Sequence, residues 1–383
     1  MLKNNYSPGN KVTLLHSGEE YFTELLNVIN TATTLLHLQV YILDEDTTGT
    51  KIIEALKAAA LRGVEVYVMV DGFGSNSLST KCIQQIKASG IHFRFFSPFP
   101  FSSLTQSGRR LHHKICVADN AIALIGGINI ADKYSGFNQT VAWFDYAVKT
   151  EGIICANITA LCESIWQRRF RKQKQRSVSD HATRGESLVR ISRNDWLRRK
   201  NEISIEYKQK LRTAKKEIII VASYFIPSRK LLAILIKAAK QKRSVSIILT
   251  RKSDVPFIKA ATTYLYDKML RNGIRIFEYK ESVLHAKVCV VDEEWCTIGS
   301  HNLNHLSEFL SVETNVSIID KKFAKSFANE LKQVMKNHCI EITFDEHKKR
   351  ATIFQRLGRW ISFKLVGWSI WILNLINWKD TKK

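Results

Sequence analysis

The same frame of eight residues occurs twice in this chain: a His, any residue, a Lys, four residues and an Asp. The first copy begins at His112 in LHHKICVADN, and the second begins at His285 in LHAKVCVVDE. Each copy is followed by an apolar run and a glycine-led turn that ends in an Asn, at Asn129 and Asn302, and the spacing from His to Asn is the same in both. Two frames with matching tails indicate a duplicated unit, so we expect two similar halves.

Both frames lie in short runs rich in Val and Ile, a composition typical of β-strands. Side chains two residues apart point to the same face of a strand. We therefore expect His112 to project together with Lys114, and His285 together with Lys287. The intervening His113 should face the other way.

The last member of each frame, Asp119 or Asp292, completes the motif and is counted among the catalytic candidates. Each Asp lies seven residues beyond its His and so on the opposite face of a strand. This position favours a role in holding a turn over a role in the chemistry.

The residue types of the two frames suit a reaction at phosphorus. Lys supplies positive charge and Asn supplies an amide donor, which together bind the non-bridging oxygens of a phosphate. Imidazole can attack phosphorus or carry a proton near neutral pH. With two His, one can attack while the other protonates the leaving oxygen. We therefore expect transfer through a phosphohistidine, with no metal and no cofactor.

The repeat extends beyond the two frames. A helix at 19–31 and a strand ending near Tyr41 in the first half match a helix near 203–214 and a strand before Tyr224 in the second. The ten residues by which the first half is longer fall in SPFPFSSLTQSGRR, a turn-rich stretch expected to form a loop at the mouth of the site. Alternating helices and strands predict an α/β fold of two pseudo-symmetric α/β/α sandwich halves.

Length and charge predict the domain limits. We expect a first domain at 1–165, a basic linker at 166–200, a second domain at 201–345 and a terminal segment at 346–383. Arg168 to Arg176 holds six basic residues in nine. A solvated linker is the favoured interpretation of this run, and contact with anionic lipid is the alternative.

The composition indicates the partner and the compartment. The formal net charge is +23, which implies an anionic partner: a phosphate ester, a nucleic acid or an acidic membrane. The seven Cys include no C-x-x-C pair and read as small core residues of a reducing compartment. The first residues lack the apolar region of a signal peptide, and no stretch reaches the ~20 apolar residues that span a bilayer.

The terminal segment reads FQRLGRWISFKLVGWSIWILNLINWKDTKK and contains half of the Trp residues. On a helix they fall within roughly 80° of one another: Trp360, Trp368, Trp371 and Trp378. Trp favours the headgroup boundary of a membrane, and the flanking Lys and Arg favour anionic lipid. We expect an amphipathic anchor lying in the membrane surface. The alternative is a terminal helix packed on the protein's own core.

The paired frames with their G-[GS]-x-N tails resemble the phospholipase D superfamily. Further segments are similar to bacterial cardiolipin synthases of the short type, which lack amino-terminal transmembrane helices. These segments are Trp143-Phe144-Asp145, Asn194-Asp195 before Arg198-Arg199, Tyr224-Phe225-Ile226-Pro227 and Ser311-Val312-Glu313-Thr314-Asn315. The resemblance covers roughly residues 15 to 340.

The resemblance implies a reaction. His112 would attack the phosphorus of one phosphatidylglycerol while His285 protonates the leaving glycerol. His285 would then deprotonate a hydroxyl of a second phosphatidylglycerol, and cardiolipin would form. The lysines and the two Asn would hold the phosphate oxygens.

The resemblance also implies two carboxylates that orient the histidines, and a location. Glu313 would orient the imidazole of His285, and Asp145 that of His112. The protein would be peripheral, at the cytoplasmic face of the bacterial inner membrane, with an anionic phospholipid membrane as its partner and no nucleic acid.

Two alternatives remain open. A phosphodiesterase of the same superfamily, either a lipid hydrolase or a nuclease, would use water as the acceptor, and high positive charge fits a nuclease too. A non-catalytic membrane-binding protein would need no intact frames. The identity of the donor and acceptor lipids, the nucleophilic His, the share of hydrolysis and the oligomeric state are left open by the sequence.

Overall fold

The computed structural model describes residues 6–98, 109–137, 141–167, 185–198, 200–304, 311–349 and 352–380. The turn-rich stretch before the first frame at residues 99–108, the basic run Arg168–Arg176, Arg199 and His305 lie outside the described residues.

Each half is built on a mixed sheet, and the two sheets have the same strand order. The first half runs β4 (His92–Phe96), β3 (Glu65–Asp71), β2 (Leu35–Val40), β6 (Ile115–Ala118), β7 (Ile122–Gly126), β8 (Tyr146–Gly152) and β1 (Ser7–His16). The second runs β13 (Arg275–Val283), β12 (Ser244–Lys252), β11 (Glu217–Ala222), β14 (Lys287–Val291), β15 (Trp295–Gly299), β16 (Ser311–Ile319) and β9 (Ser187–Asp195). The predicted duplication is therefore present strand by strand.

The two sheets meet at β1 and β9, which pair antiparallel. Shorter strands complete the sheets: β5 (Arg110–Leu111) pairs with β16, β10 (Lys200–Asn201) with β9, and β17 (Cys339–Ile342) with β13. The single-turn helix η2 (Trp196–Arg198) joins β9 to β10.

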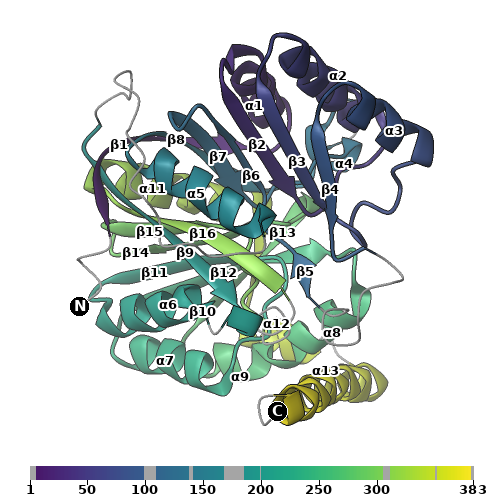
Figure 1. The fold of residues 1–383 in the computed structure, drawn as a ribbon. Helices are drawn as coiled ribbons and strands as arrows, with labels where there is room; N and C mark the ends of the chain where they lie inside the picture. The colour runs from purple at the N-terminus through teal and green to yellow at the C-terminus, as the bar shows by residue number, and fades with distance from the viewer. Residues whose placement is uncertain are drawn as a thin grey trace.

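Helices cover the sheets in layers (Figure 1). The first half contributes α1 (Glu19–Thr31), α2 (Thr47–Leu61), α3 (Thr80–Ala88), α4 (Asp132–Ser135) and α5 (Ile154–Trp166). The second half contributes α6 (Glu202–Thr213), α7 (Arg229–Lys240), α8 (Pro256–Tyr264), α9 (Tyr266–Leu270), α11 (Lys321–His338), α12 (Phe344–Lys349) and α13 (Ile353–Asp380).

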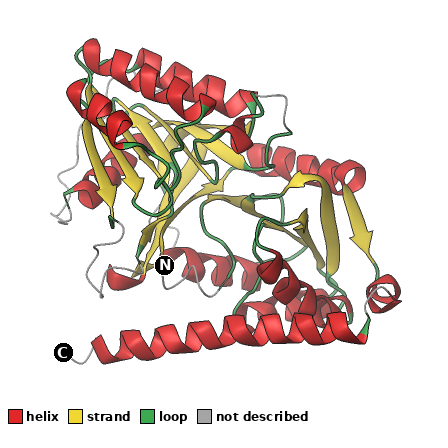
Figure 2. Cartoon of the chain, turned by 90° about the vertical axis from the view of Figure 1, so that its right-hand side faces the viewer, coloured by secondary structure: helices red, strands yellow, loops and turns green. Residues whose placement is uncertain are grey.

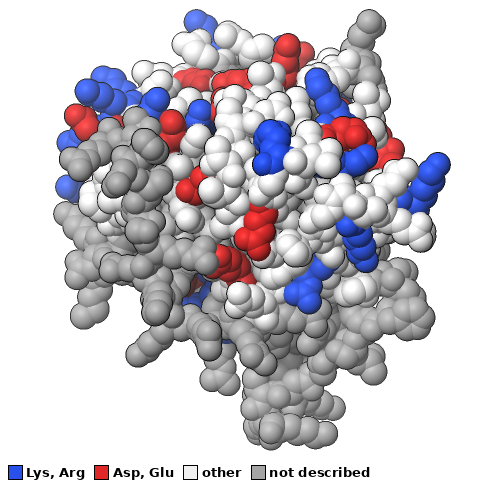
Figure 3. All heavy atoms as spheres, turned by 45° about the horizontal axis from the view of Figure 1, so that its top comes forward, with Lys and Arg blue, Asp and Glu red and all other residues white. Residues whose placement is uncertain are grey.

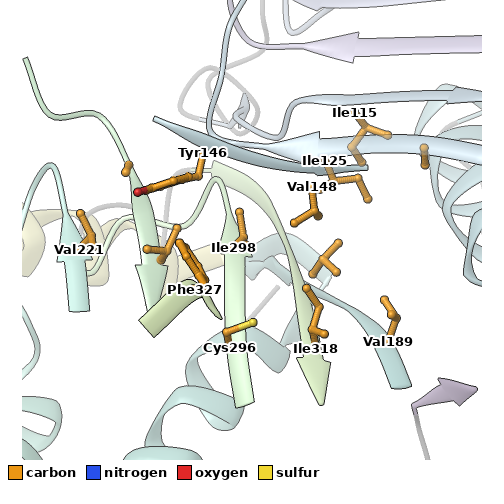
Figure 4. Packing of buried hydrophobic residues seen from close by; sticks show 14 of the residues in the cluster. Ile115, Ile125, Tyr146, Val148, Val189, Val221, Cys296, Ile298, Ile318 and Phe327 are labelled. Carbon is orange, nitrogen blue, oxygen red and sulfur yellow. The ribbon is translucent and has the colours of Figure 1, made fainter. Parts of the chain in front are cut away.

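Three cores follow from this layering. One lies under α1, α2 and α3, and a second lies under α6 and α7. The third is shared by the two halves and includes side chains of α5 and α11. Figure 4 shows side chains of both halves meeting there, among them Ile125 and Val148 of the first half and Ile298 and Ile318 of the second. The halves therefore form one body around a common apolar layer.

Local sequence explains why α11 occupies this layer. The Asp320 side chain caps the helix by accepting a hydrogen bond from the Phe323 N–H. The buried residues recur at helical spacing: Ala324, Phe327, Ala328, Leu331 and Val334. The resulting apolar stripe faces the shared core.

The structure corrects the predicted linker. Residues Ser187–Asp195 form β9, which pairs with β16 along its length and takes the place in the second sheet that β1 takes in the first. The linker expected at 166–200 therefore contains a strand of the second sheet, and we propose that the second half begins at β9.

The terminal helix α13 packs on α8. Ser362 and Val366 are buried, and Val366 contacts Ile226 and Ala261. Figure 2 shows α13 as a long helix along one side of the molecule. Within the described residues, no helix combines the length and the apolar character that crossing a membrane requires.

Candidate active site

The backbone of each histidine segment is bound to the opposite half. The His112 N–H donates to the carbonyl of Val312 in β16, with an N···O distance of 3.0 Å. The His285 N–H donates to the carbonyl of Phe144, just before β8, at 2.8 Å. These two contacts are equivalent in the repeat, and they bring both frames to the junction of the halves.

Each histidine also contacts a carboxylate of the opposite half, and that carboxylate belongs to the residue after the one whose carbonyl binds the histidine N–H. The His112 Nδ1 atom lies 3.0 Å from Glu313 Oε2, and the His285 Nδ1 atom lies 2.6 Å from Asp145 Oδ2. The expected assignment, Glu313 to His285 and Asp145 to His112, is therefore wrong. The physical reason is that each His lies beside the strand of the other half, so the adjacent carboxylate comes from that half.

These contacts determine the tautomers. A carboxylate accepts hydrogen bonds, so the Nδ1–H of each imidazole donates to it and Nε2 is left as the basic nitrogen. The arrangement prepares both imidazoles to attack an electrophile or accept a proton through Nε2.

The environment keeps both imidazoles neutral near pH 7. Burial lowers the pKa of His112, Lys114 and Lys287 lower it further, and Glu313 opposes them. Burial and the positive charge of Lys287 lower the pKa of His285 to about 4, against the effect of Asp145. Because Lys287 of one half acts on His112 of the other, the two frames share one electrostatic environment.

The lysines of the two frames are buried in the same cluster. Lys114 Nζ donates to the carbonyl of His112, and Lys287 Nζ lies 3.0 Å from His285 Nδ1. Burial lowers the pKa of Lys114 to about 7, with Lys287 acting in the same direction and Glu313 against it. Burial also lowers the pKa of Lys287. Two buried ammonium groups that lower each other's proton affinity favour an anion beside them.

The carboxylates are ionised. Burial by itself would raise the pKa of Glu313, but the interaction and hydrogen bond with His112 bring that pKa down to about 2. Burial also opposes ionisation of Asp145, whose pKa is lowered by Lys287 and His285. Each orienting group therefore stays charged near neutral pH.

The glycine-led turns allow the carboxylates to approach. A Cβ added at Gly127 would lie 2.4 Å from Asp145 Oδ1, so this position tolerates no side chain. The equivalent residue, Ser300, instead donates its hydroxyl to Glu313. In the first half the Gly therefore leaves room for the orienting carboxylate, and in the second half the Ser hydrogen-bonds to it.

The two Asn residues at the ends of these turns are buried beside the frames. Asn129 Nδ2 donates to the Tyr134 hydroxyl at 2.9 Å, and the Asn302 carboxamide oxygen accepts from the Ser223 hydroxyl at 2.9 Å. Each carboxamide is thus held in a defined orientation, and the ring centroid of Tyr134, the hydrogen-bond partner of Asn129, lies 5.3 Å from that of His285.

Asp119 and Asp292 are not part of this cluster, which corrects their place among the catalytic candidates. The Asp119 carboxylate accepts from the backbone N–H groups of 33, 34 and 35, at 2.8–2.9 Å. The Asp292 carboxylate accepts from those of 215, 216 and 217, at 2.7–2.9 Å. Both residues have positive φ, at 53° and 55°, as turn residues do. They tie the far ends of β6 and β14 to the starts of β2 and β11.

His113 also lies outside the cluster. It is buried, and its Nε2 lies 2.9 Å from Gln39 Oε1 while its Nδ1 lies 3.3 Å from the Thr314 hydroxyl. The regular strands do not include the His-x-Lys part of the first frame, since β5 ends at Leu111 and β6 begins at Ile115. The alternation of side chains across His112, His113 and Lys114 nevertheless holds.

Sequence reasoning missed the residues that hold the segments before each His. Asp71 Oδ2 accepts from the Leu111 N–H at 2.8 Å, and the Thr250 hydroxyl accepts from the equivalent Leu284 N–H at 3.2 Å. A carboxylate in one half and a hydroxyl in the other accept the equivalent N–H. Because the two residue types differ, comparison of the repeats did not reveal them. The position of each, at the carboxyl end of a parallel strand, is the signal that could have found them.

Aromatic rings line the histidines. The ring centroid of Tyr41 lies 5.0 Å from that of His112, and the centroids of Tyr134 and Trp143 lie 5.3 and 5.9 Å from that of His285. These rings limit water around the imidazoles. Among the residues that the structure describes, no group of three or more His, Cys, Asp or Glu is arranged to hold a metal ion.

Known proteins resemble this chain in both sequence and fold. The family described as "Cardiolipin synthase, PLD-like domain" matches residues 25–166 and 207–335. Cardiolipin synthase B of Escherichia coli (strain K12) is 32% identical over 353 residues, which is 89% of this chain and 84% of that protein. A cardiolipin synthase of Clostridium perfringens (strain SM101 / Type A) is 29% identical over 92% of this chain and 76% of its own length.

The solved structures extend the likeness to the fold. The crystal structure of phosphatidylserine synthase from Haemophilus influenzae Rd KW20 matches with a TM-score of 0.75 at 14% identity, over 98% of this chain and 97% of that one. Polyphosphate kinase from Porphyromonas gingivalis matches with a TM-score of 0.59 at 16% identity, over 88% of this chain and 49% of that one.

Proposed function

Since this chain belongs to the cardiolipin synthase family of phospholipase D-like phosphatidyltransferases, we propose that it joins two phosphatidylglycerol molecules into cardiolipin and releases glycerol. The observation that carries the proposal is the crossed pair of oriented imidazoles with a buried Lys beside each. Such a pair suits a reaction in two steps. One imidazole carries the phosphatidyl group between the steps, while the other donates a proton in the first step and accepts one in the second.

In the first step, Nε2 of His112 attacks the phosphorus of one phosphatidylglycerol. The bond from phosphorus to the glycerol headgroup oxygen breaks, and His285 gives its proton to that oxygen. His285 carries this proton because the negative charge of the bound phosphodiester raises the pKa of the imidazole beside it. Glycerol leaves, and a phosphatidyl-histidine remains on His112.

In the second step, a glycerol hydroxyl of a second phosphatidylglycerol attacks the same phosphorus. His285, now neutral, takes the hydroxyl proton, and the bond between phosphorus and His112 breaks. The product is cardiolipin, and both histidines return to their first state. Lys114, Lys287 and the amides of the two Asn stabilise the charge that grows on the phosphate oxygens.

We propose further that α13 holds the enzyme on the membrane surface as a peripheral protein, at the cytoplasmic face of the bacterial inner membrane. One side of the helix packs on α8, while the other leaves Phe354, Leu357 and Trp368 exposed at 85%, 51% and 69%. An apolar face of this kind favours a membrane interface, since large exposed apolar patches mark interaction sites. The side chains of Trp371 and Trp378 lie outside the described residues.

Purified protein with vesicles of labelled phosphatidylglycerol tests the reaction. Chromatography should show a lipid with four acyl chains and an equal amount of free glycerol. Phosphatidic acid as the main product would instead indicate a hydrolase. Mass spectrometry after rapid acid-free quenching should find the phosphatidyl adduct on His112, and an adduct on His285 would reverse the assigned roles.

A further inference from the structure

A basic cavity lies where α13 begins, outside the active site. Residues of α8, α9, α12 and the first turns of α13 enclose about 350 Å³. This volume falls within the roughly 300–1,000 Å³ of small-molecule sites. Six basic side chains line it: Lys268, Arg271, His347, Lys348, Arg356 and Arg359.

The charges around this cavity are not balanced. Five of the lining residues are Lys or Arg, and one, Asp267, is a carboxylate whose oxygen lies 2.9 Å from Arg271 Nε. Glu278, whose charge also reaches Arg359, is already bonded to Lys259 Nζ and to the Tyr266 hydroxyl. A surplus of positive charge therefore remains in the cavity, and it selects an anion.

Two of the basic groups, Arg359 and His347, are partly withdrawn from water, while the other lining cations are exposed. Burial lowers the pKa of Arg359, and burial together with the charge of Arg359 lowers that of His347. The Arg356 guanidinium is held in place by donating to the Lys348 carbonyl at 2.8 Å. Positive groups that are crowded and partly desolvated gain more from an anionic ligand than cations in open solvent do.

Elsewhere on the surface the two signs of charge are mixed. On the face shown in Figure 3, which brings forward the end of the molecule that carries α1 and α2 in Figure 1, Lys and Arg lie interspersed with Asp and Glu. The cavity at α13 differs from that face because one sign of charge dominates it.

The first turns of α13 both line the cavity and carry the exposed apolar residues. Arg356 and Arg359 are three residues apart on the helix, and Ser362, which is buried against the body, continues the same side. Phe354 and Leu357, on the other side, are exposed. A helix lying in a membrane surface with this apolar face downward would place its arginines at headgroup depth.

We propose that this cavity binds the phosphodiester headgroup of an anionic phospholipid that does not react. Guanidinium groups bind phosphate oxygens through paired hydrogen bonds, and the neighbouring apolar side chains would contact the acyl chains of the same lipid. A free phosphate offers the first contact but not the second. The site rests on the proposed membrane contact of α13 and not on the proposed reaction.

A change of Arg to Lys tests the site without altering the charge. Arg356→Lys combined with Arg359→Lys keeps both positive charges but removes the planar donors. The matched control is Arg212→Lys combined with Arg243→Lys, two arginines of a second basic groove between α6 and α7. Binding to vesicles of phosphatidylglycerol and phosphatidylcholine is measured by flotation, and turnover is measured on detergent-solubilised phosphatidylglycerol.

We expect the α13 double variant to bind vesicles about tenfold more weakly, since Lys keeps the charge but lacks the paired hydrogen bonds of the guanidinium group. The control should bind as the wild type does, and both variants should keep their turnover in detergent. Unchanged binding of the α13 variant would overturn the site, as would an equal loss in the control.

Two further measurements separate the sources of the phosphate. Calorimetry with inorganic phosphate alone should show weak binding or none. If the α13 variant loses phosphate binding while its vesicle binding is unchanged, the cavity is a free-anion site and the lipid proposal is wrong. If the wild type fails to bind the vesicles, the membrane contact and this site fail together. If the protein binds vesicles through these arginines but makes no cardiolipin, only the proposed reaction is wrong.

Discussion

The crossed pairing predicts which carboxylate acts on which imidazole, and Glu313→Gln tests it. Gln keeps the length of the side chain but removes its charge. Burial raises the pKa of Glu313, yet His112 and Lys114 bring it from 4.5 to about 2, a difference worth about 3 kcal/mol to the ionised carboxylate. If this interaction supports the transition state, its loss should lower kcat about 100- to 300-fold.

Nuclear magnetic resonance titration of labelled imidazoles measures the pKa of each histidine and so tests the pairing directly. Glu313 raises the pKa of His112, so Glu313→Gln should lower that pKa further and leave the pKa of His285 unchanged. Asp145→Asn is the reciprocal control, because Asp145 raises the pKa of His285. It should lower the pKa of His285 and leave that of His112 unchanged.

A shift at the other histidine would refute the reasoning. If Glu313→Gln moved the pKa of His285 instead of His112, each carboxylate would act within its own half. Equal shifts at both histidines would show that the variant disturbs the whole cluster and not one contact. Circular dichroism spectra that match the wild type confirm that the comparison is made on folded protein.

The remaining predictions concern the nucleophile, the anchor, the turns and metal. His112→Ala and His285→Ala should each abolish cardiolipin formation in folded protein; more than about one-hundredth of the wild-type rate in either would remove the two-histidine scheme. Deleting residues 360–383 should release the protein from phosphatidylglycerol vesicles but preserve turnover on detergent-solubilised lipid, and continued sedimentation with vesicles would contradict the anchor. Asp119→Asn should lower the free energy of unfolding by about 1–3 kcal/mol with kcat within about twofold, as chemical denaturation and initial rates can check. Hydrogen bonds from backbone N–H groups lower the pKa of Asp119 against the effect of burial, so its contribution is present above the ordinary pKa of 3.8 and is lost as the pH falls through the lowered value. A chelator should leave turnover unchanged, and strong inhibition would point to a metal that the scheme lacks.

Local structure followed closely from local sequence. The helix expected at 19–31 has those limits in α1, and the helix expected near 203–214 is α6, Glu202–Thr213. These segments have apolar residues at helical spacing beside turn residues, so residues close together in the sequence are enough to predict them.

Strand β9 escaped prediction because its sequence, SLVRISRND, resembles a charged linker. Its Arg190 and Arg193 are buried, and an Arg190 nitrogen lies 3.6 Å from Glu206 Oε1. A charged residue is buried where a distant partner compensates it, and the partner is not visible in the segment itself. The sequence pattern therefore failed to predict the strand by which the two halves are connected.

Spacing along the chain was enough to predict the duplication and the paired His and Lys of the two frames, and it favoured a turn role for each frame's last Asp. The tertiary structure alone decided that each histidine is oriented by the carboxylate of the opposite half. His112 and Glu313 are separated by 201 residues and meet because β5 lies beside β16. Distance along a chain does not specify which strands become neighbours, and that choice is made by the apolar layer that the two halves bury together.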